Sequence, residues 1–156
     1  MKRIATVLLI SLVTISTSAQ FSGHDHKAEG VPAYNAAPPP KNAKLAPILT
    51  GAQLAAAKFT HPAQVKSYQE AAKYAAVLHQ LPCYCHCDRN QGHASLRTCF
   101  ETDHGANCGT CMQEALFAAE ETRKGKTAKQ IREAVIRGDH AKIDLYKVTL
   151  AKASTK

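Results

Sequence analysis

Six cysteines lie within 29 consecutive residues, from Cys83 to Cys111, and this cluster constrains the chain more than any other feature. Cysteine makes up about a fifth of the segment, whereas roughly 8–10% already indicates a cross-linked chain. The whole sequence has 156 residues, which suits a single domain with a tail. Beyond residue 15, only 18 Val, Ile and Leu residues remain to build a core. A core this small usually needs disulfides or a metal, so the cysteines are the expected cross-link.

Residues 1–19 have the three-part pattern of a secretory signal peptide. Lys2 and Arg3 precede an apolar run over residues 4–15, and small residues ending at Ala19 supply a cleavage site. The run is shorter than the roughly 20 apolar residues that span a bilayer. We therefore expect an exported protein, periplasmic or extracellular, without a transmembrane helix. No cysteine near the cleavage point offers a site for a lipid anchor.

The chain is basic, with 20 Lys and Arg against 12 Asp and Glu, a formal net charge of +8. The basic residues are scattered rather than interleaved with aromatic residues, and an exported protein rarely meets nucleic acid. The charge therefore predicts a solvated surface and no nucleic-acid partner. A homo-oligomer, or a partner protein that exchanges metal or redox equivalents, stays open.

Composition divides the rest of the chain into three parts. Residues 20–47 are rich in Pro and Ala, which favours a disordered, extended linker over a packed element. Residues 48–150 form the expected Cys/His-rich domain, and residues 151–156 a frayed tail.

Apolar spacing of three and four residues predicts a mainly α domain, with a Cys/His-rich turn between helices. One helix is expected from Thr60, as N-cap, to the residue before Pro82, with Lys66 and Glu70 paired on its outer face. A short helix should span residues 95–101.

Two further helices are expected in the second half. One begins near residue 107 and ends before Gly125. The next opens on a capping box of Thr127 and Gln130 and stops at Gly138.

The run CYCHC at residues 83–87 alternates thiol and non-thiol side chains. In an extended strand its three sulfurs would lie about 6.6–6.8 Å apart on one side. Two thiolates bound to one zinc ion need sulfurs roughly 4 Å apart. Shared ligation therefore requires the backbone to curl, which Pro82 before the run and Gly92 after it permit.

The other candidate donors follow within 30 residues. Cys108 and Cys111 lie three apart in the first turn of a helix, where the helix dipole should make thiols more acidic. His93 and His104 each stand beside a glycine, which lets backbone approach closely. The candidate metal ligands are Cys83, Cys85, Cys87, His93, Cys99, His104, Cys108 and Cys111.

Soft thiolates combined with imidazoles select copper(I) or zinc, and closely packed C-x-C-x-C thiolates resemble sites in which sulfur bridges metals. We favour a metal-binding protein, with copper as the ion and zinc as the alternative, because sulfur outnumbers nitrogen and the chain is expected to be exported. Six clustered cysteines argue against one dedicated nucleophile, so no catalytic residue is assigned and enzymatic activity is not the favoured interpretation.

Two alternatives stay open. The pair CGTC at residues 108–111 could exchange disulfides with a client protein, although no βαβ pattern surrounds it. Alternatively, three disulfides could staple a structural or interaction domain, as an even cysteine count in an oxidising compartment allows. Neighbouring C-x-C cysteines are awkward partners for each other, so such bridges would converge on one short segment.

Other side chains near the cluster have simpler interpretations. Tyr84 is expected to pack against the preceding helix, and Met112 to belong to the core. His140 is expected on the surface and Glu114 in solvent. His86 would point away from its neighbouring thiols in an extended segment, which favours a solvated imidazole.

The spacing of these residues resembles the exported bacterial proteins named for a PCYCGC or CYCXC motif, some of which carry selenocysteine. The resemblance implies export, often lipidation, and no established reaction, and it supports the same eight donor positions. His86 stands where that motif often has glycine, and the lipid-attachment cysteine of some members is missing. The matching segments are LPCYCHC (81–87), GHxSLxxCF (92–100), HGxxCxxC (104–111) and EA (114–115).

Overall fold

The computed structural model describes residues 30–150. The expected signal peptide, the first part of the linker and the frayed tail lie outside the described residues. Within them the chain is helical and contains no strand, which confirms the mainly α fold class. No helix among the described residues is long and apolar enough to cross a membrane. The elements are α1 (Gly51–Ala56), α2 (Pro62–Lys73), α3 (Ala75–Leu78), α4 (Cys87–Asn90), α5 (Gly109–Arg123) and α6 (Ala128–Ile136), with 3₁₀ helices η1 (Leu96–Phe100), η2 (Asp103–Asn107), η3 (Asp139–Lys142) and η4 (Leu145–Lys147).

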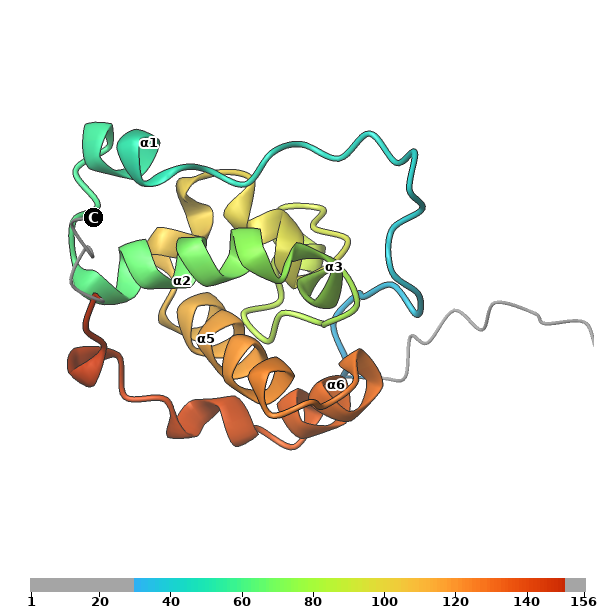
Figure 1. Ribbon diagram of the computed structural model, residues 1–156. Coiled ribbons are helices and arrows are strands. Elements are labelled where there is room, and N and C mark those ends of the chain that lie inside the picture. The colour runs from blue at the N-terminus through green and yellow to red at the C-terminus, as the bar shows by residue number, and fades with distance from the viewer. Residues whose placement is uncertain (1–29, 151–156) are drawn as a thin grey trace, which may run out of the picture.

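Helix α5 is the centre of the domain. It contacts α2, α3, η1 and η2 on one side and α6, η3 and η4 on the other (Figure 1). Fully buried alanines at 115, 118 and 119 keep the surface of α5 narrow, so that neighbouring helices approach closely. Cys108 is the N-cap of α5 and Cys111 lies in its first turn, so the position of α5 fixes one wall of the cysteine cluster.

The expected helix over residues 61–81 is divided. It runs as α2 to Lys73, breaks at Tyr74, which has φ −113°, and resumes as the single turn α3. The N-cap is His61 rather than Thr60, because the His61 imidazole accepts a hydrogen bond from the Ala63 amide at 3.2 Å. The Thr127 capping box is confirmed at the start of α6.

The pair of Lys66 and Glu70 forms at 2.8 Å, but Glu70 is buried rather than on an outer face. The second carboxylate oxygen of Glu70 accepts from Arg123 of α5 at 2.9 Å. The carboxylate thus connects α2 to α5. Burial by itself would raise the pKa of Glu70, but the hydrogen bonds and charges of its two cations together hold that pKa below its usual value.

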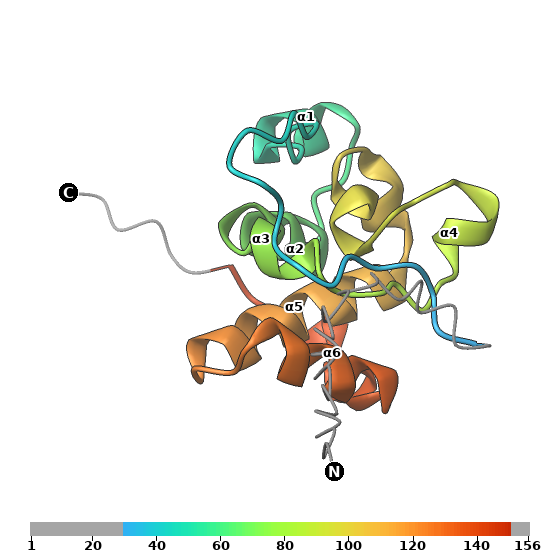
Figure 2. The same ribbon diagram turned by 90° about the vertical axis from the view of Figure 1, so that its right-hand side faces the viewer.

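Part of the expected disordered linker is packed against the domain instead. Residues 31–40 run as extended chain along α4 and α3 (Figure 2). Pro32 is buried, and the Ala33 amide donates to the Asp88 carboxylate at 3.0 Å. Asn35 bonds the carbonyl of His79 through its side-chain amide at 3.0 Å. Proline favours the extended conformation, as expected, but these contacts fix it in place.

Tyr68 holds the 3₁₀ helices to α2. Its hydroxyl donates to the Thr102 carbonyl at 2.5 Å and accepts from the Ala106 amide at 3.1 Å, so it bonds to both ends of the turn that forms η2. Its ring lies edge-on to Phe100 of η1, with ring centroids 4.9 Å apart. Because η1 carries Cys99 and η2 carries His104, this one side chain positions two candidate ligands.

Replacing Tyr68 with Phe should lower the free energy of unfolding by about 2 kcal/mol, since it removes two hydrogen bonds and leaves the buried Ala106 amide unpaired. Chemical denaturation of the reduced protein measures the loss. Tyr146→Phe is the matched control, because Tyr146 is 93% exposed and its replacement should change stability by less than about 0.5 kcal/mol. Equal effects of the two variants would contradict this role for Tyr68.

Candidate metal centre

The backbone curls between Cys83 and Cys87, as shared ligation requires. The His86 amide bonds the Cys83 carbonyl at 3.0 Å, which closes a turn. The two sulfurs of Cys83 and Cys85 lie 3.2 Å apart, less than half their spacing in an extended strand. His86 sits in the left-handed region at φ 55°, immediately before α4.

Five sulfurs come together around this turn. The Sγ atoms of Cys83, Cys85, Cys87, Cys99 and Cys111 all lie within 4.8 Å of one another. The shortest contacts across the cluster are Cys83 to Cys111 at 3.3 Å and Cys85 to Cys111 at 3.5 Å. All six cysteines are free thiols. A disulfide has an S–S length of about 2.05 Å, so none of these contacts is a bond, and the five thiols form a group that could hold a metal ion.

A second group combines two thiols with two imidazoles. Its ligand atoms are the sulfurs of Cys87 and Cys99 and one ring nitrogen each of His93 and His104, again within 4.8 Å of one another. His104 Nε2 lies 3.0 Å from Cys87 Sγ, and His93 Nδ1 lies 3.2 Å from Cys99 Sγ. Burial, together with the neighbouring His104, lowers the pKa of His93 and favours the neutral imidazole that ligates metals.

Cys108 lies outside both groups. It is the N-cap of α5 and half-buried, whereas Cys111, one turn further along, has no exposed surface. The structure therefore brings seven of the eight predicted donors into two overlapping groups and leaves Cys108 beside them.

The thiols of the cluster do not share the acidity expected at a helix start. Hydrogen bonds from Cys108 and Cys111 lower the pKa of Cys85. Cys111 shows the opposite shift, because its hydrogen bonds with Cys108 and Cys83, together with burial, raise its pKa. For Cys87, burial raises the pKa. In the metal-free protein the surrounding thiols therefore stabilise one thiolate, on Cys85, by donating hydrogen bonds to it.

Gly105 lets η1 and η2 meet. A Cβ at this position would stand 2.9 Å from the Cys99 carbonyl oxygen and 3.1 Å from the Phe100 ring. The close backbone approach expected at His104-Gly105 is therefore confirmed, and it places His104 next to the turn that carries Cys99. Gly92 serves differently, because it adopts φ +66° with open space around it.

A buried carboxyl group that the sequence did not reveal supports the cluster from behind. Glu114 has no exposed surface, although solvation was expected. Its Oε1 accepts from the Tyr84 amide at 2.8 Å, which ties the cysteine turn to α5. Its Oε2 finds no hydrogen-bond partner among residues 30–150. Burial raises the pKa of Glu114 to about 8, so the group is mostly protonated at neutral pH.

His140 completes this support and is also buried, contrary to the expected surface position. Its Nε2 lies 4.0 Å from Glu114 Oε1, and its ring stacks on Tyr84 with centroids 6.2 Å apart. Tyr84 thus packs against η3, which comes from the far end of the domain. In the sequence Glu114 follows Cys111 by three residues, which places these two side chains on one face of α5. This spacing is the one sequence pattern that indicates a position for Glu114 beside the cysteines.

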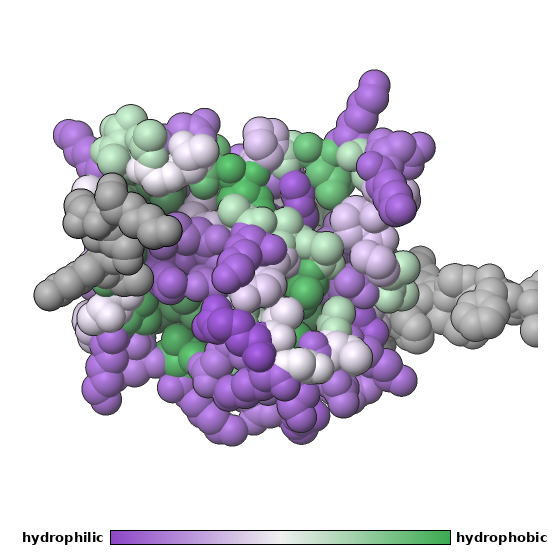
Figure 3. All heavy atoms as spheres, viewed as in Figure 1, coloured by the Kyte–Doolittle hydropathy of each residue, from purple (hydrophilic) through white to green (hydrophobic). Residues whose placement is uncertain are grey.

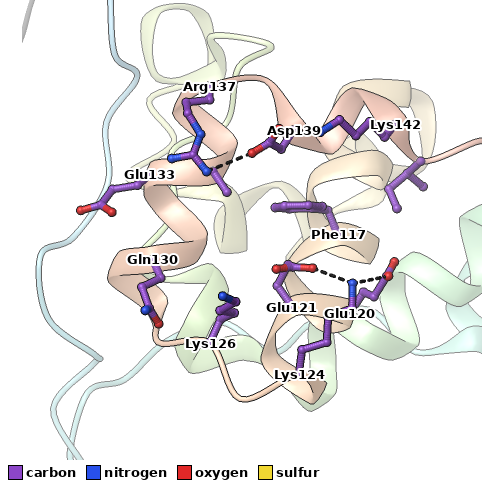
Figure 4. Close-up of a pocket in the computed structure, with 12 residues that line it drawn as sticks. Phe117, Glu120, Glu121, Lys124, Lys126, Gln130, Glu133, Arg137, Asp139 and Lys142 are labelled. Atoms are coloured by element: carbon purple, nitrogen blue, oxygen red, sulfur yellow. Dashed lines mark hydrogen bonds and ion pairs between the residues drawn. The ribbon is translucent and has the colours of Figure 1, made fainter.

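A surface hollow of about 600 Å³ lies away from the cysteines, between α5, α6 and η3 (Figure 4). Its walls carry charged side chains already paired with each other, such as Lys124 with Glu121 at 2.9 Å and Asp139 with Lys142 at 2.8 Å. Hydrophilic residues cover this lower edge of the molecule in Figure 3. The described cysteines line no part of the hollow, so it is separate from the candidate site.

Fold and site together define a small helical protein whose buried Cys/His cluster could hold a metal ion. A family model described as "Protein of unknown function with PCYCGC motif" matches residues 53–144, and the chain belongs to this family. The match confirms the resemblance drawn from the cysteine spacing. No curated protein and no solved structure matches the chain.

The motif's usual glycine falls at His86, whose left-handed backbone explains the preference, because a side chain there costs roughly 1–2 kcal/mol. His86→Gly should therefore raise the free energy of unfolding by about 1 kcal/mol in thermal or chemical denaturation. Lys58→Gly is the matched control, at φ 65° and far along the chain from the cysteines. If Lys58→Gly stabilises the protein and His86→Gly destabilises it, the His86 side chain contributes contacts that outweigh its backbone strain.

Glu114 should make the metal-free protein less stable as pH rises. The unfolded carboxyl loses its proton near pH 4.5 and the folded one near pH 8, so between these values the unfolded state binds fewer protons. Stability should fall there by up to about 1.4 kcal/mol per pH unit relative to Glu114→Gln, whose side chain does not titrate. Denaturation of both proteins across pH 5–8 measures the difference. Parallel pH profiles would contradict the buried neutral carboxyl.

Proposed function

We propose that the protein is an exported copper-binding protein that holds Cu(I) in its cluster of thiols and imidazoles. The observation that carries this proposal is the convergence of five sulfurs within 4.8 Å of one another, with two imidazoles adjoining them. Export is supported by the leader pattern of residues 1–19, which lies outside the described residues.

The donor set favours copper over zinc. Structural zinc sites usually close on four ligands, whereas the cluster offers five sulfurs at one centre. An excess of soft thiolates suits Cu(I), which accepts low coordination numbers and shares sulfur ligands between ions. Burial of Cys83, Cys87, Cys99 and Cys111 shields the site from oxidants in solvent.

The thiol-exchange alternative has less support. A nucleophilic thiol must be reachable, and in the pair at residues 108–111 only Cys108 is partly exposed. Cys111 is fully buried, and its sulfur contacts the sulfurs of Cys83 and Cys85. The stapled-domain alternative requires disulfides, and the same short sulfur contacts would supply the pairs on oxidation.

An anaerobic titration tests copper binding directly. The reduced protein should remove Cu(I) from a chromophoric chelator, and Cys111→Ser should weaken that affinity at least about tenfold, equivalent to about 1.4 kcal/mol. Cys108→Ser is the matched control, because its sulfur lies outside both groups and a serine hydroxyl can still donate a hydrogen bond to Cys85, so its affinity should stay within about threefold of the unchanged protein. A protein that leaves the copper with the chelator, yet binds zinc tightly, would contradict the proposal.

A further inference from the structure

We propose that the two donor groups form a single binuclear centre, in which the thiolates of Cys87 and Cys99 bridge two Cu(I) ions. This inference rests on the proposed copper-binding function and specifies how many ions are held and by which donors. It follows from the membership of the two groups, because Cys87 and Cys99 are the two residues common to both.

The shared thiols belong to both groups, and each group adds its own candidate terminal donors. In one group these are imidazoles, with His93 Nδ1 3.2 Å from Cys99 Sγ and His104 Nε2 3.0 Å from Cys87 Sγ. In the other group these are the sulfurs of Cys83, Cys85 and Cys111, which form a compact triangle 3.2 to 3.5 Å apart. Without the shared thiols, the second group would keep only its two imidazoles, so its ion depends on them. A thiolate sulfur has more than one lone pair, and it can therefore bind an ion toward each side.

Burial restricts the bridging pair to ligands inside the cluster. Cys87 is 3% exposed and Cys99 has no exposed surface, so neither thiol meets solvent or a partner protein directly. Cys99 is further fixed by Gly105, whose missing side chain allows η2 to pack on the Cys99 carbonyl. Both sulfurs are therefore held at a set separation before any metal binds.

That separation determines how far apart the two ions can be. The sulfurs of Cys87 and Cys99 are 3.7 Å apart. If each ion lies about 2.3 Å from both sulfurs, the four atoms form a rhombus whose metal-to-metal diagonal is at most about 2.7 Å. Folding the rhombus brings the ions closer still.

Such a short separation favours monovalent ions. Repulsion scales with the product of the charges, so two divalent zinc ions at this distance repel each other four times as strongly as two Cu(I) ions. The two bridging thiolates offset the charge of two Cu(I) ions, and each thiol releases its proton to solvent as its ion binds. The two ions and the two bridging thiolates together are then neutral, and each terminal thiolate that binds adds one negative charge.

Copper stoichiometry and the copper-to-copper distance test the inference on the full-length reduced protein. Native mass spectrometry after anaerobic loading with Cu(I) should show two copper ions per chain. X-ray absorption should show a copper neighbour within about 2.7 Å of each copper, with sulfur as the dominant ligand and a minor nitrogen contribution.

Substitutions test the imidazoles and the bridging thiols separately. Combined His93→Ala and His104→Ala should reduce the content to one copper and abolish the copper-to-copper signal, while leaving the sulfur ligands. His79→Ala is the matched control, because this imidazole belongs to neither group, and it should keep both ions. Cys87→Ser or Cys99→Ser should each abolish the copper-to-copper signal. If Cys87→Ser or Cys99→Ser fails to fold, the X-ray absorption of the unchanged protein tests the bridged centre by itself.

Three outcomes would overturn the inference. One copper per chain, or two without a copper neighbour within about 3 Å, would refute the bridged centre and leave the copper-binding function standing. More than two copper ions would indicate a larger thiolate cluster and refute the assignment of two. Absence of bound copper would refute the proposed function and the bridged centre together.

Discussion

Convergence of five thiols on one buried point is the constraint on which the rest of the structure depends. The sulfurs come from the turn at residues 83–87, from η1 and from the first turn of α5, so three segments must meet. Helix α5 serves as the common support, because it contacts nearly every other helix and carries Cys111. A small core and a dense cysteine cluster are thus two aspects of one arrangement, in which the cluster occupies the place of apolar side chains.

The protein accepts local costs to hold this arrangement. His86 keeps a left-handed backbone where glycine would be relaxed. Glu114 is buried with one oxygen unpaired among the described residues, and it stays near the cluster as a neutral acceptor for the Tyr84 amide. Costs of this kind persist where function or a bound ligand offsets them. One lies within the cysteine turn and the other is hydrogen-bonded to it, which supports a ligand-binding role for the cluster.

Several helices and most of the candidate site could be predicted from the sequence. Periodic apolar spacing and the Thr127 capping box are local patterns, and they correctly located α5 and α6. The cysteine and histidine spacing predicted eight candidate donors because they cluster within 29 residues, and the structure brings all of them but Cys108 into the two groups. Burial of Glu114 and His140 could not be predicted, because it depends on η3 folding back onto α5. The division of the donors into two groups that share Cys87 and Cys99 is likewise a property of three-dimensional packing.

The central claim is that the cluster binds metal rather than forming disulfides. Intact-mass analysis of the protein isolated anaerobically from its native host, first in native and then in denaturing thiol-alkylating conditions, tests it most directly. We predict bound copper in the native spectrum and six alkylated cysteines after denaturation, one for each free thiol. A metal-free protein with every cysteine paired, and so no alkylation, would contradict the account.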